Sequence, residues 1–328
     1  MGGVGIALSA PRARASWRTG WVWAGLALLA LIAWPLLVSR YQIVLGTEVI
    51  ILALFAMSYN LIFGYAGMVA FGLAAFFGLG ADTMAILGKT YGAPMLAGRR
   101  AAPLLAAAAA VAIGWFCMRT VRLYFSLLTL AFAQLLWVVV YQWVEVTGGS
   151  DGIHGLQRPE ALSSYASYYW FTLAVAAVCV ALLWFIVNSP FGWSLRAIRE
   201  NTQRSRFLGI DDRFYKLVAF TLAAAFAGIA GALYAQFQKW ADPDLLYWTT
   251  SANPVLMSIL GGMFSFAGPC IGAVVFVALR EVIKLRTDYW PMVLGLVLLG
   301  LVLVVPDGIA GAARRVGSLL RRKEARSP

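Results

Sequence analysis

The sequence contains very few of the residues that catalytic and metal sites use. Histidine occurs once in 328 residues, and cysteine occurs three times, at Cys117, Cys179 and Cys270. These cysteines lie far apart inside apolar runs, which is typical of small buried hydrophobic residues and not of metal ligands or disulfide partners. The phosphate-binding pattern GxxxxGK[ST] is also missing, so an ATP-driven process would need another chain to bind the nucleotide. The sequence predicts neither a metal site nor a bound cofactor.

A catalytic site is equally difficult to assemble. The single histidine, His154, follows Ser150 and Asp151 in a glycine-rich loop. A catalytic triad needs side chains that converge from a rigid scaffold, so adjacency in such a loop does not make one. An intramembrane hydrolase or acyltransferase would need a histidine within an apolar span, and no span contains one. We expect no catalytic residue, and a protein that is not an enzyme.

Charged residues are scarce as well. They make up 12% of the chain, whereas a soluble domain has about a quarter. Apolar residues reach 62%, and the mean hydropathy is +0.79. A soluble core of this length could not bury so much apolar surface, so the sequence predicts that lipid is the solvent and excludes a soluble enzyme.

The net charge of +12 is concentrated in three stretches, 1–20, 188–216 and 307–328. Basic residues between apolar spans mark the cytoplasmic side of a membrane, so this charge indicates topology and not nucleic-acid binding. The expected organisation is a basic cytoplasmic tail at 1–20, a transmembrane domain at 21–306 that contains the cytoplasmic loop 188–216, and a second basic cytoplasmic tail at 307–328.

The apolar runs predict an all-α integral membrane protein. A helix needs about 20 apolar residues to cross the bilayer core. The candidate runs are 21–38, 43–63, 66–88, 101–118, 123–145, 169–187, 217–237, 245–264, 269–283 and 290–305. With both termini cytoplasmic, the pattern favours ten crossings, some of them broken; eight would result if 245–283 formed re-entrant half-helices. The ten-crossing scheme places three basic residues on the outer side of the membrane, although basic residues are expected on the cytoplasmic side. They are Lys89, Arg99 and Arg100.

Glycines crowd two of the apolar stretches. They are Gly64, Gly67, Gly72, Gly78 and Gly80 in the first stretch, and Gly261, Gly262, Gly268 and Gly272 in the second. Glycine-interrupted segments in two halves of a transporter point to its central binding site, although small residues also simply permit close helix packing. Among the few ionisable residues in the spans, Asp82 lies deepest, whereas Glu48 and Glu281 lie near span ends.

The loop 188–216 is the most informative segment. A turn at Ser189–Gly192 precedes a predicted amphipathic helix from Trp193 to Phe207, and Gly209 is expected to end it. A short amphipathic helix between two membrane spans suits a groove on a soluble partner; the alternative is a helix that lies flat on anionic lipid.

These residues resemble the cytoplasmic coupling loop of LivM-type permeases, which serve ABC importers of branched-chain amino acids. The similarity rests on several ordered motifs between about residues 45 and 310. They are YFSLLTLAFAQ (124–134), TGGSDG (147–152), NSPFGWSLRAIREN (188–201), LGI (208–210), YKLVAF (215–220), AGIAGALY (227–234) and LGGMFSFAGP (260–269).

The resemblance implies a multi-pass subunit of a bacterial inner membrane that carries no ATP site. Its implied partners are a second, LivH-like permease, two cytoplasmic ATPases and a periplasmic solute-binding protein, which the outer loop at 148–158 would contact. Segment 193–209 would be the coupling helix. The implied coupling residues are Leu195, Arg196, Ile198, Arg199, Glu200, Asn201, Leu208 and Gly209.

The resemblance also marks a candidate translocation path, with one departure from the family pattern. The path candidates are Gly67, Met68, Ala70, Gly72, Leu73, Asp82, Gln134, Gly261 and Gly262. The family's first glycine-rich segment reads close to G-x-x-G-Q-x-S-x-G-H-A-A-F and then G-A-Y, where this chain has Met68, Ala70, Leu73 and Asp82 at the polar and tyrosine positions. The expected substrate is a branched-chain or related amino acid, with an aromatic amino acid, an amide or a urea-like solute as alternatives.

A self-contained carrier driven by protons or sodium is the competing hypothesis. It would need a protonatable relay or an ion cage at membrane depth. Asp82 and Glu48 supply little material for one, so transport powered by partner ATPases is the favoured prediction.

Overall fold

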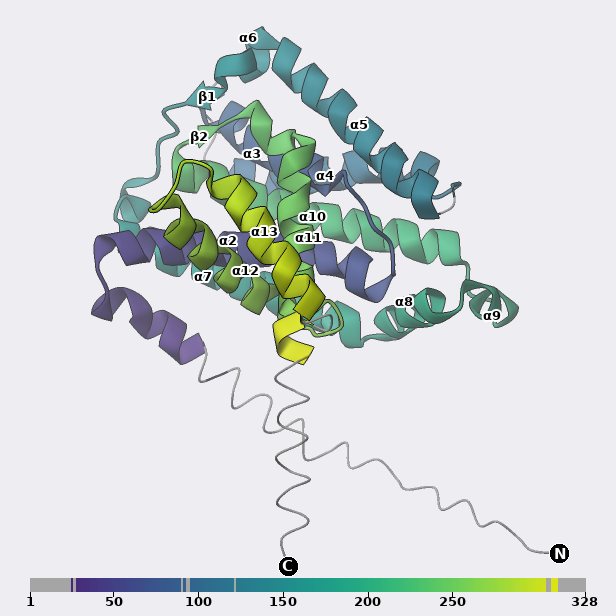
Figure 1. Ribbon diagram of the computed structural model, residues 1–328. Helices are drawn as coiled ribbons and strands as arrows, with labels where there is room; N and C mark the ends of the chain where they lie inside the picture. The colour runs from purple at the N-terminus through teal and green to yellow at the C-terminus, as the bar shows by residue number, and fades with distance from the viewer. Residues whose placement is uncertain are drawn as a thin grey trace, which may run out of the picture.

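The computed structural model describes residues 25, 28–89, 91–92, 95–120, 122–304 and 308–311. Over these residues the chain is mostly helical, as the sequence predicts (Figure 1). The strands described are β1 (Ile153–His154) and β2 (Trp240–Ala241), an antiparallel pair in which Ile153 lies opposite Ala241. The predicted basic tail 1–20 and most of the tail 307–328 lie outside the described residues.

The helices follow the predicted apolar runs closely. After an apolar helix at Leu28–Leu37 they are α2 (Arg40–Asn60), α3 (Leu73–Lys89), α4 (Met95–Cys117), α5 (Arg122–Gln142), α6 (Val144–Thr147), α7 (Tyr165–Asn188), α8 (Pro190–Glu200), α9 (Thr202–Phe207), α10 (Asp212–Gln238), α11 (Trp248–Gly261), α12 (Gly268–Lys284) and α13 (Trp290–Val304). Short turns are a π-helix at Leu61–Tyr65 and 3-10 helices at Gly149–Asp151, Glu160–Leu162 and Pro243–Leu246.

Five described helices are long and apolar enough to cross a membrane. They are Arg40–Tyr65, Met95–Cys117, Leu123–Gln142, Tyr165–Asn188 and Asp212–Gln238. The predicted run 66–88 is corrected, because residues 66–72 form an irregular turn in which Gly67 has a φ of +70°, and α3 begins only at Leu73. At 1.5 Å per residue α3 and α11 are about 26 Å and 21 Å long, short of the bilayer core of about 30 Å.

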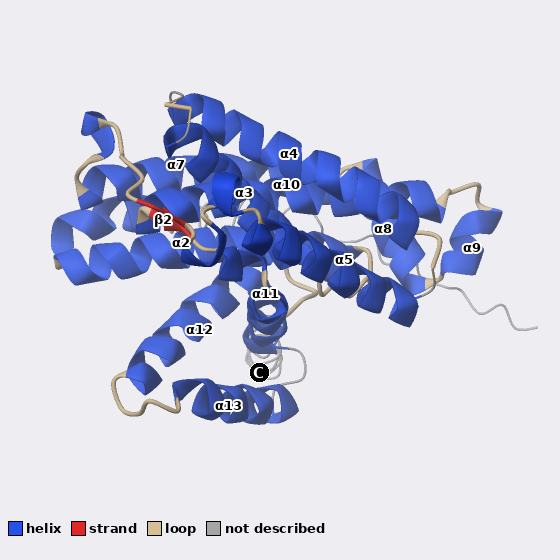
Figure 2. Cartoon of the chain, turned by 90° about the horizontal axis from the view of Figure 1, so that it is seen from above, coloured by secondary structure: helices blue, strands red, loops and turns tan. Residues whose placement is uncertain are grey.

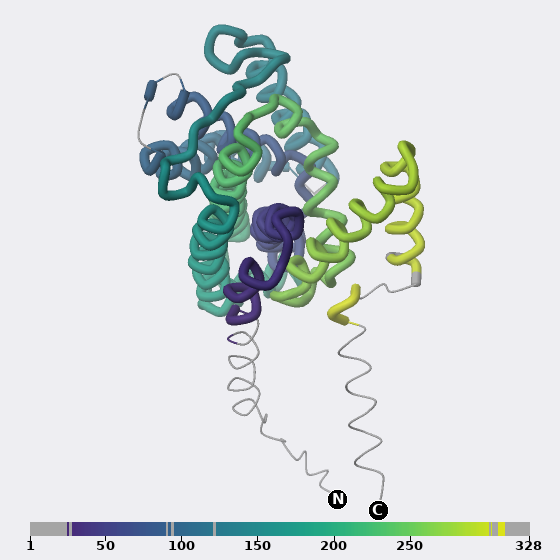
Figure 3. Tube along the Cα trace, turned by 90° about the vertical axis from the view of Figure 1, so that its left-hand side faces the viewer, coloured from purple at the N-terminus to yellow at the C-terminus, as the bar shows by residue number. Residues whose placement is uncertain are grey.

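The core lies around α2, which packs against α7, α10, α11 and α12 (Figure 3). Large buried side chains on α2 and α3, such as Phe55 and Phe77, contact each other there with ring centroids 4.5 Å apart. Glycines let α3 and α10 approach backbone to backbone: a Cβ at Gly231 would lie 1.8 Å from the Phe77 carbonyl oxygen, and one at Gly80 would lie 2.1 Å from that of Gly228. Close packing therefore explains this part of the glycine pattern.

Gly231→Ala should destabilise the protein by about 1–3 kcal/mol, because the added methyl overlaps the α3 backbone and neither helix can move aside cheaply. Gly300→Ala is the matched control, since its Cβ would meet nothing within 4 Å. The measurement is thermal unfolding of the two variants in the same detergent. A melting temperature that falls equally in both, or in neither, would contradict the packing argument.

Helices α11, α12 and α13 form an arm that extends from the main bundle (Figure 2). Within it, a Cβ at Gly272 would lie 1.8 Å from the Met257 carbonyl oxygen, so α11 and α12 also pack backbone to backbone. An ion pair fastens the arm to α2: Arg280 Nη2 lies 2.9 Å from Glu48 and 3.2 Å from Glu281, whose other oxygen accepts a hydrogen bond from Tyr41. Glu48 and Glu281 therefore have structural partners.

Loops gather at two ends of the bundle. One end holds the 61–72 turn, the α8–α9 segment and the 262–267 turn. The other end holds the β1–β2 pair and the C-terminal end of α10, where Arg158 donates to the carbonyl oxygens of Gln236 and Phe237 at 2.8 and 2.5 Å. Arg99 meets the same region, because it donates to Gln236 Oε1 and its guanidinium lies 3.7 Å from the Phe171 ring centroid.

Candidate functional site

The α8–α9 segment folds back sharply at the end of α7. Pro190 occupies the first turn of α8, and Gly192 allows the tight approach, because a Cβ there would lie 2.1 Å from the Val187 carbonyl oxygen. The apolar face of α8 then packs inward, where Leu195 and Ile198 are 0% and 1% exposed. These two predicted coupling residues thus hold the helix onto the protein's own body and are not presented to a partner.

The prediction of one helix from Trp193 to Phe207 is wrong, because the chain breaks at Asn201. Asn201 is extended, and its side chain accepts a hydrogen bond from the Arg204 backbone N–H at 2.9 Å, which starts α9 as a separate helix. An asparagine side chain that caps a new helix competes with continuing the old one. The end of α9 agrees with the prediction: Gly209 follows with φ of +81°.

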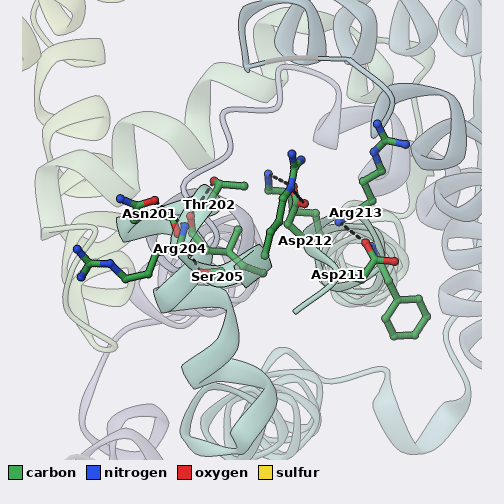
Figure 4. Close-up of polar contacts among 11 residues, drawn as sticks. Asn201, Thr202, Arg204, Ser205, Asp211, Asp212 and Arg213 are labelled. Atoms are coloured by element: carbon green, nitrogen blue, oxygen red, sulfur yellow. Dashed lines mark hydrogen bonds and ion pairs between the residues drawn. The ribbon is translucent and has the colours of Figure 1, made fainter. Parts of the chain in front are cut away.

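An ion-pair cluster joins α9 to α10 (Figure 4). Asp211 caps α10 by accepting from the backbone N–H groups of Arg213 and Phe214. The buried Asp212 carboxylate lies 2.6 Å from Arg206 and 3.1 Å from Lys216, and its hydrogen bond raises the pKa of the Arg206 guanidinium above its ordinary value. Arg204 extends away from Asp212 in this view. The cluster fixes the angle at which the segment leaves the bundle.

The tip of the segment carries exposed apolar side chains. Phe207 is 92% exposed and Leu208 73% exposed, with Trp193 and Phe214 also exposed nearby. Among the predicted coupling residues, Glu200, Asn201 and Gly209 are exposed, whereas Arg196 and Arg199 are half-buried. We call Phe207 and Leu208 the apolar tip. Their apolar character beside the Gly209 turn was the sequence signal for it.

Arg199 connects this segment to both glycine-rich stretches. Its guanidinium donates to the Gly64 carbonyl oxygen and lies 5.0 Å from the Phe264 ring centroid, and its side-chain carbons pack against Gly67. The two stretches also touch directly, since a Cβ at Gly64 would lie 2.3 Å from the Met263 carbonyl oxygen. The resemblance marked Arg199 as a coupling residue, but nothing in its local sequence pattern signalled these contacts with the glycine-rich stretches.

The predicted path residues separate into groups. Gly67 and Met68 line a cleft of about 510 Å³ beside α8 and α9, which we call the basic cleft. Ala70 and Leu73 are fully buried, and Gly72 lies against the Thr129 backbone. The half-buried Gln134 has a buried Nε2 with no hydrogen-bond partner among the described residues. Gly261 and Gly262 lie at the α11–α12 turn, where Gly261 contacts Gly268.

Asp82 lies apart from these residues. It is 5% exposed on α3, and its Oδ2 has no hydrogen-bond partner in the described part of the chain. The neighbouring Ala81 packs with Ile153 and Ala241 of the β1–β2 pair, at the end opposite Gly67. The predicted single constellation is therefore divided between two ends of the bundle.

The comparisons with known proteins agree on one family. The model of the permease component of branched-chain amino acid transport systems matches residues 43–305. The high-affinity branched-chain amino acid permease protein LivM of Escherichia coli is 29% identical, over 88% of this chain and 74% of that protein. The corresponding LivH protein is 26% identical, over 79% and 91%.

Two more distant similarities accompany these. The autoinducer 2 import permease protein LsrC of Salmonella typhi is 31% identical, over 56% of this chain and 53% of that protein. Among solved structures, PsaBC from Streptococcus pneumoniae in complex with Fab covers 88% of this chain and 99% of its own, at 14% identity and a TM-score of 0.48.

Proposed function

Because this chain belongs to the family of permease components of branched-chain amino acid transport systems, we propose that it is the membrane-spanning permease subunit of an ABC importer and moves a branched-chain or related amino acid inward. Two features of the α8–α9 segment support this mechanism. Its apolar tip is exposed, and its Arg199 contacts both glycine-rich stretches. ATP binding and hydrolysis reside on partner chains.

Ten crossings with cytoplasmic termini are supported by the contacts at the α8–α9 end. Loops that this scheme puts inside are 64–72, 118–122, 188–216 and 262–267. Arg199 contacts Gly64 and Phe264, and the basic cleft is lined from 66–69, 118–126 and 198–216. Gly308, after the last span, packs against Gly262. Loops from four separate places in the chain thus meet where the basic loop lies.

The opposite end supports the same scheme. Loops that it puts outside meet there: β1 pairs with β2, Arg158 and Arg99 contact Gln236, and Tyr41 contacts Glu281. The eight-crossing alternative needs the α11–α12 turn to stop inside the membrane, whereas Phe264 of that turn contacts the cytoplasmic loop through Arg199. Arg99 is a basic residue on the outer side in this scheme, and its contacts with Gln236 and Phe171 explain why it is there.

The apolar tip is the surface that docks in a groove of a cytoplasmic ATPase. Apolar side chains that are 92% and 73% exposed on a rigid capped segment are suited to a partner's groove, and anchors of this kind carry most of the affinity of an interface. Asn201, Asp211 and the Asp212 ion pairs keep the tip oriented. Leu195 and Ile198 do not contact the partner in this proposal; they are buried and pack α8 against α7 and α10.

Movement of the tip reaches the transport path through Arg199. When the ATPases close on ATP they pull α8 and α9, and Arg199 pulls on the Gly64 backbone and on Phe264 together. Backbone-to-backbone contacts between α11 and α12 and between α3 and α10 make these helices move as rigid pairs. The permease then rocks between outward-facing and inward-facing states.

The path residues suggest a more apolar route than the family pattern. Met68, Ala70 and Leu73 replace polar residues of that pattern, and Gln134 has a buried Nε2 with no hydrogen-bond partner among the residues that the structure describes. These features suit a hydrophobic amino acid side chain beside one polar contact. An aromatic amino acid, an amide or a urea-like solute remains the second candidate class.

Asp82→Asn should change substrate preference more than the amount of protein in the membrane, because it replaces a buried carboxyl group with an amide of similar volume. Competition uptake with leucine, phenylalanine and acetamide measures this. Asp288→Asn, at an exposed outer position, is the control. Unchanged selectivity together with a lowered melting temperature would return Asp82 to a structural role.

The implied assembly is a second, LivH-like permease, two ATPases and a periplasmic binding protein in a bacterial inner membrane. The exposed Ser150, Asp151 and His154 beside β1 offer the binding protein a surface. Arg158 is held against the protein, where burial lowers the pKa of its guanidinium below its ordinary value.

Purification of the tagged chain from its native membrane tests the proposal. Two ATPase chains and a second permease should accompany it, and uptake into proteoliposomes should require ATP. A chain that purifies alone and transports without ATP would contradict the proposal in favour of an ion-coupled carrier.

A further inference from the structure

The basic cleft lies beside the α8–α9 segment, and the transport mechanism proposed above assigns no role to Arg119 or Arg213, two of the cations that line it. Its volume is about 510 Å³, and three separate segments of the chain line it: 66–69, 118–126 and 198–216. It opens beside α5 at the end of the bundle where the α8–α9 segment lies.

Charge in the cleft is strongly positive. Its lining includes five cations, Arg119, Arg199, Arg206, Arg213 and Lys216, against the single carboxylate of Asp212. Arg206 and Lys216 already pair with that carboxylate, and Arg199 donates to the Gly64 carbonyl oxygen. Arg119 and Arg213 are exposed, and neither forms an ion pair with a carboxylate among the described residues.

Part of the cleft lining is apolar and continues onto the exposed surface of α5. Met118, Leu123 and Phe125 line the cleft, and Leu123 is 79% exposed. Farther along α5, Leu127 is 62% exposed. At the mouth, the Arg119 guanidinium lies 3.7 Å from the ring centroid of Trp115, which is 50% exposed; tryptophans at membrane interfaces take up such positions.

We propose that the basic cleft binds the phosphoryl headgroup of an anionic phospholipid from the cytoplasmic leaflet, with an acyl chain along Leu123 and Leu127. The cationic and the apolar residues of the lining match the two parts of such a lipid, whereas a free anion would use only the cationic residues. Basic pockets between membrane helices on the cytoplasmic side have this specificity. The proposal rests on the membrane orientation above and not on the transported substrate.

Lipid binding to the full chain tests the proposal. The delipidated protein in mild detergent is titrated with dioleoyl phosphatidylglycerol or with dioleoyl phosphatidylcholine, and bound lipid is counted by native mass spectrometry. Arg119→Gln with Arg213→Gln should weaken phosphatidylglycerol binding about 25-fold, since each basic residue near an anionic surface contributes about fivefold. Arg100→Gln with Arg204→Gln removes the same charge outside the cleft lining and should bind like the wild type.

Three results would overturn the proposal. Equal phosphatidylglycerol binding by the wild type and by the Arg119 and Arg213 double variant would remove the cleft as the site. Full displacement by inorganic phosphate would make it a site for free anions. Displacement of the lipid by the assembled ATPases would make that partner, and not a lipid, the occupant of the cleft in the transporter. Uptake need not be measured, so failure here leaves the proposed function intact.

Discussion

Replacing both residues of the apolar tip, as Phe207→Glu with Leu208→Glu, should abolish ATP-driven uptake and leave the permease in the membrane. The two side chains are 92% and 73% exposed, so the free protein loses little when they become charged. A docked ATPase would instead have to bury two carboxylates in an apolar groove. Interface anchors of this type contribute about 2 kcal/mol or more each, and we therefore expect ATPase binding to weaken at least about 100-fold.

Co-purification of the ATPases and uptake into proteoliposomes measure this effect. Tyr91→Glu is the matched control, because Tyr91 is 73% exposed in a loop at the opposite, outer end. It should leave both measurements near the wild-type values. Normal uptake by the tip variant would show that the ATPases dock elsewhere.

Arg199→Ala should separate docking from transport. The variant keeps the apolar tip and its caps, so the ATPases should still co-purify. It loses the hydrogen bond to the Gly64 carbonyl oxygen and the contact with Phe264. Hydrogen bonds from a charged donor contribute about 1.5–3 kcal/mol, so uptake should fall about tenfold to 100-fold, and ATP hydrolysis should continue without transport.

Two further variants sharpen this test. Arg204→Ala removes an exposed cation of the same segment and should transport normally. Arg199→Lys keeps the charge but loses the planar guanidinium that lies by the Phe264 ring, so its uptake should be intermediate. Loss of the ATPases from Arg199→Ala would instead assign Arg199 to the docking surface.

The helices could be predicted from the sequence because a membrane helix satisfies its own backbone. Apolar runs such as 169–187 and 217–237 therefore mark α7 and α10 without knowledge of their neighbours. The Gly209 helix end was equally predictable, since a positive φ is a local requirement.

The break at Asn201 could not be predicted in the same way. Residues 193–207 keep a helical pattern across it, and one side-chain cap decides the outcome. The glycines gave a mixed signal for a similar reason. Gly231 and Gly272 serve helix packing, whereas Gly64 and Gly67 meet Arg199, and only their neighbours distinguish the two cases.

The sequence by itself indicated that the chain lies in a lipid bilayer, where most helices lie and which loops are basic, because each of these depends on local composition. It also indicated the family, because the family motifs occur in order along the chain. The tertiary structure alone decided which side chains of the α8–α9 segment face inward. Leu195 and Ile198 are apolar like Phe207 and Leu208, but α7 and α10 cover only the first pair. It also decided that Arg199 meets Gly64, 135 residues earlier, because such a contact exists only when separate helices pack side by side.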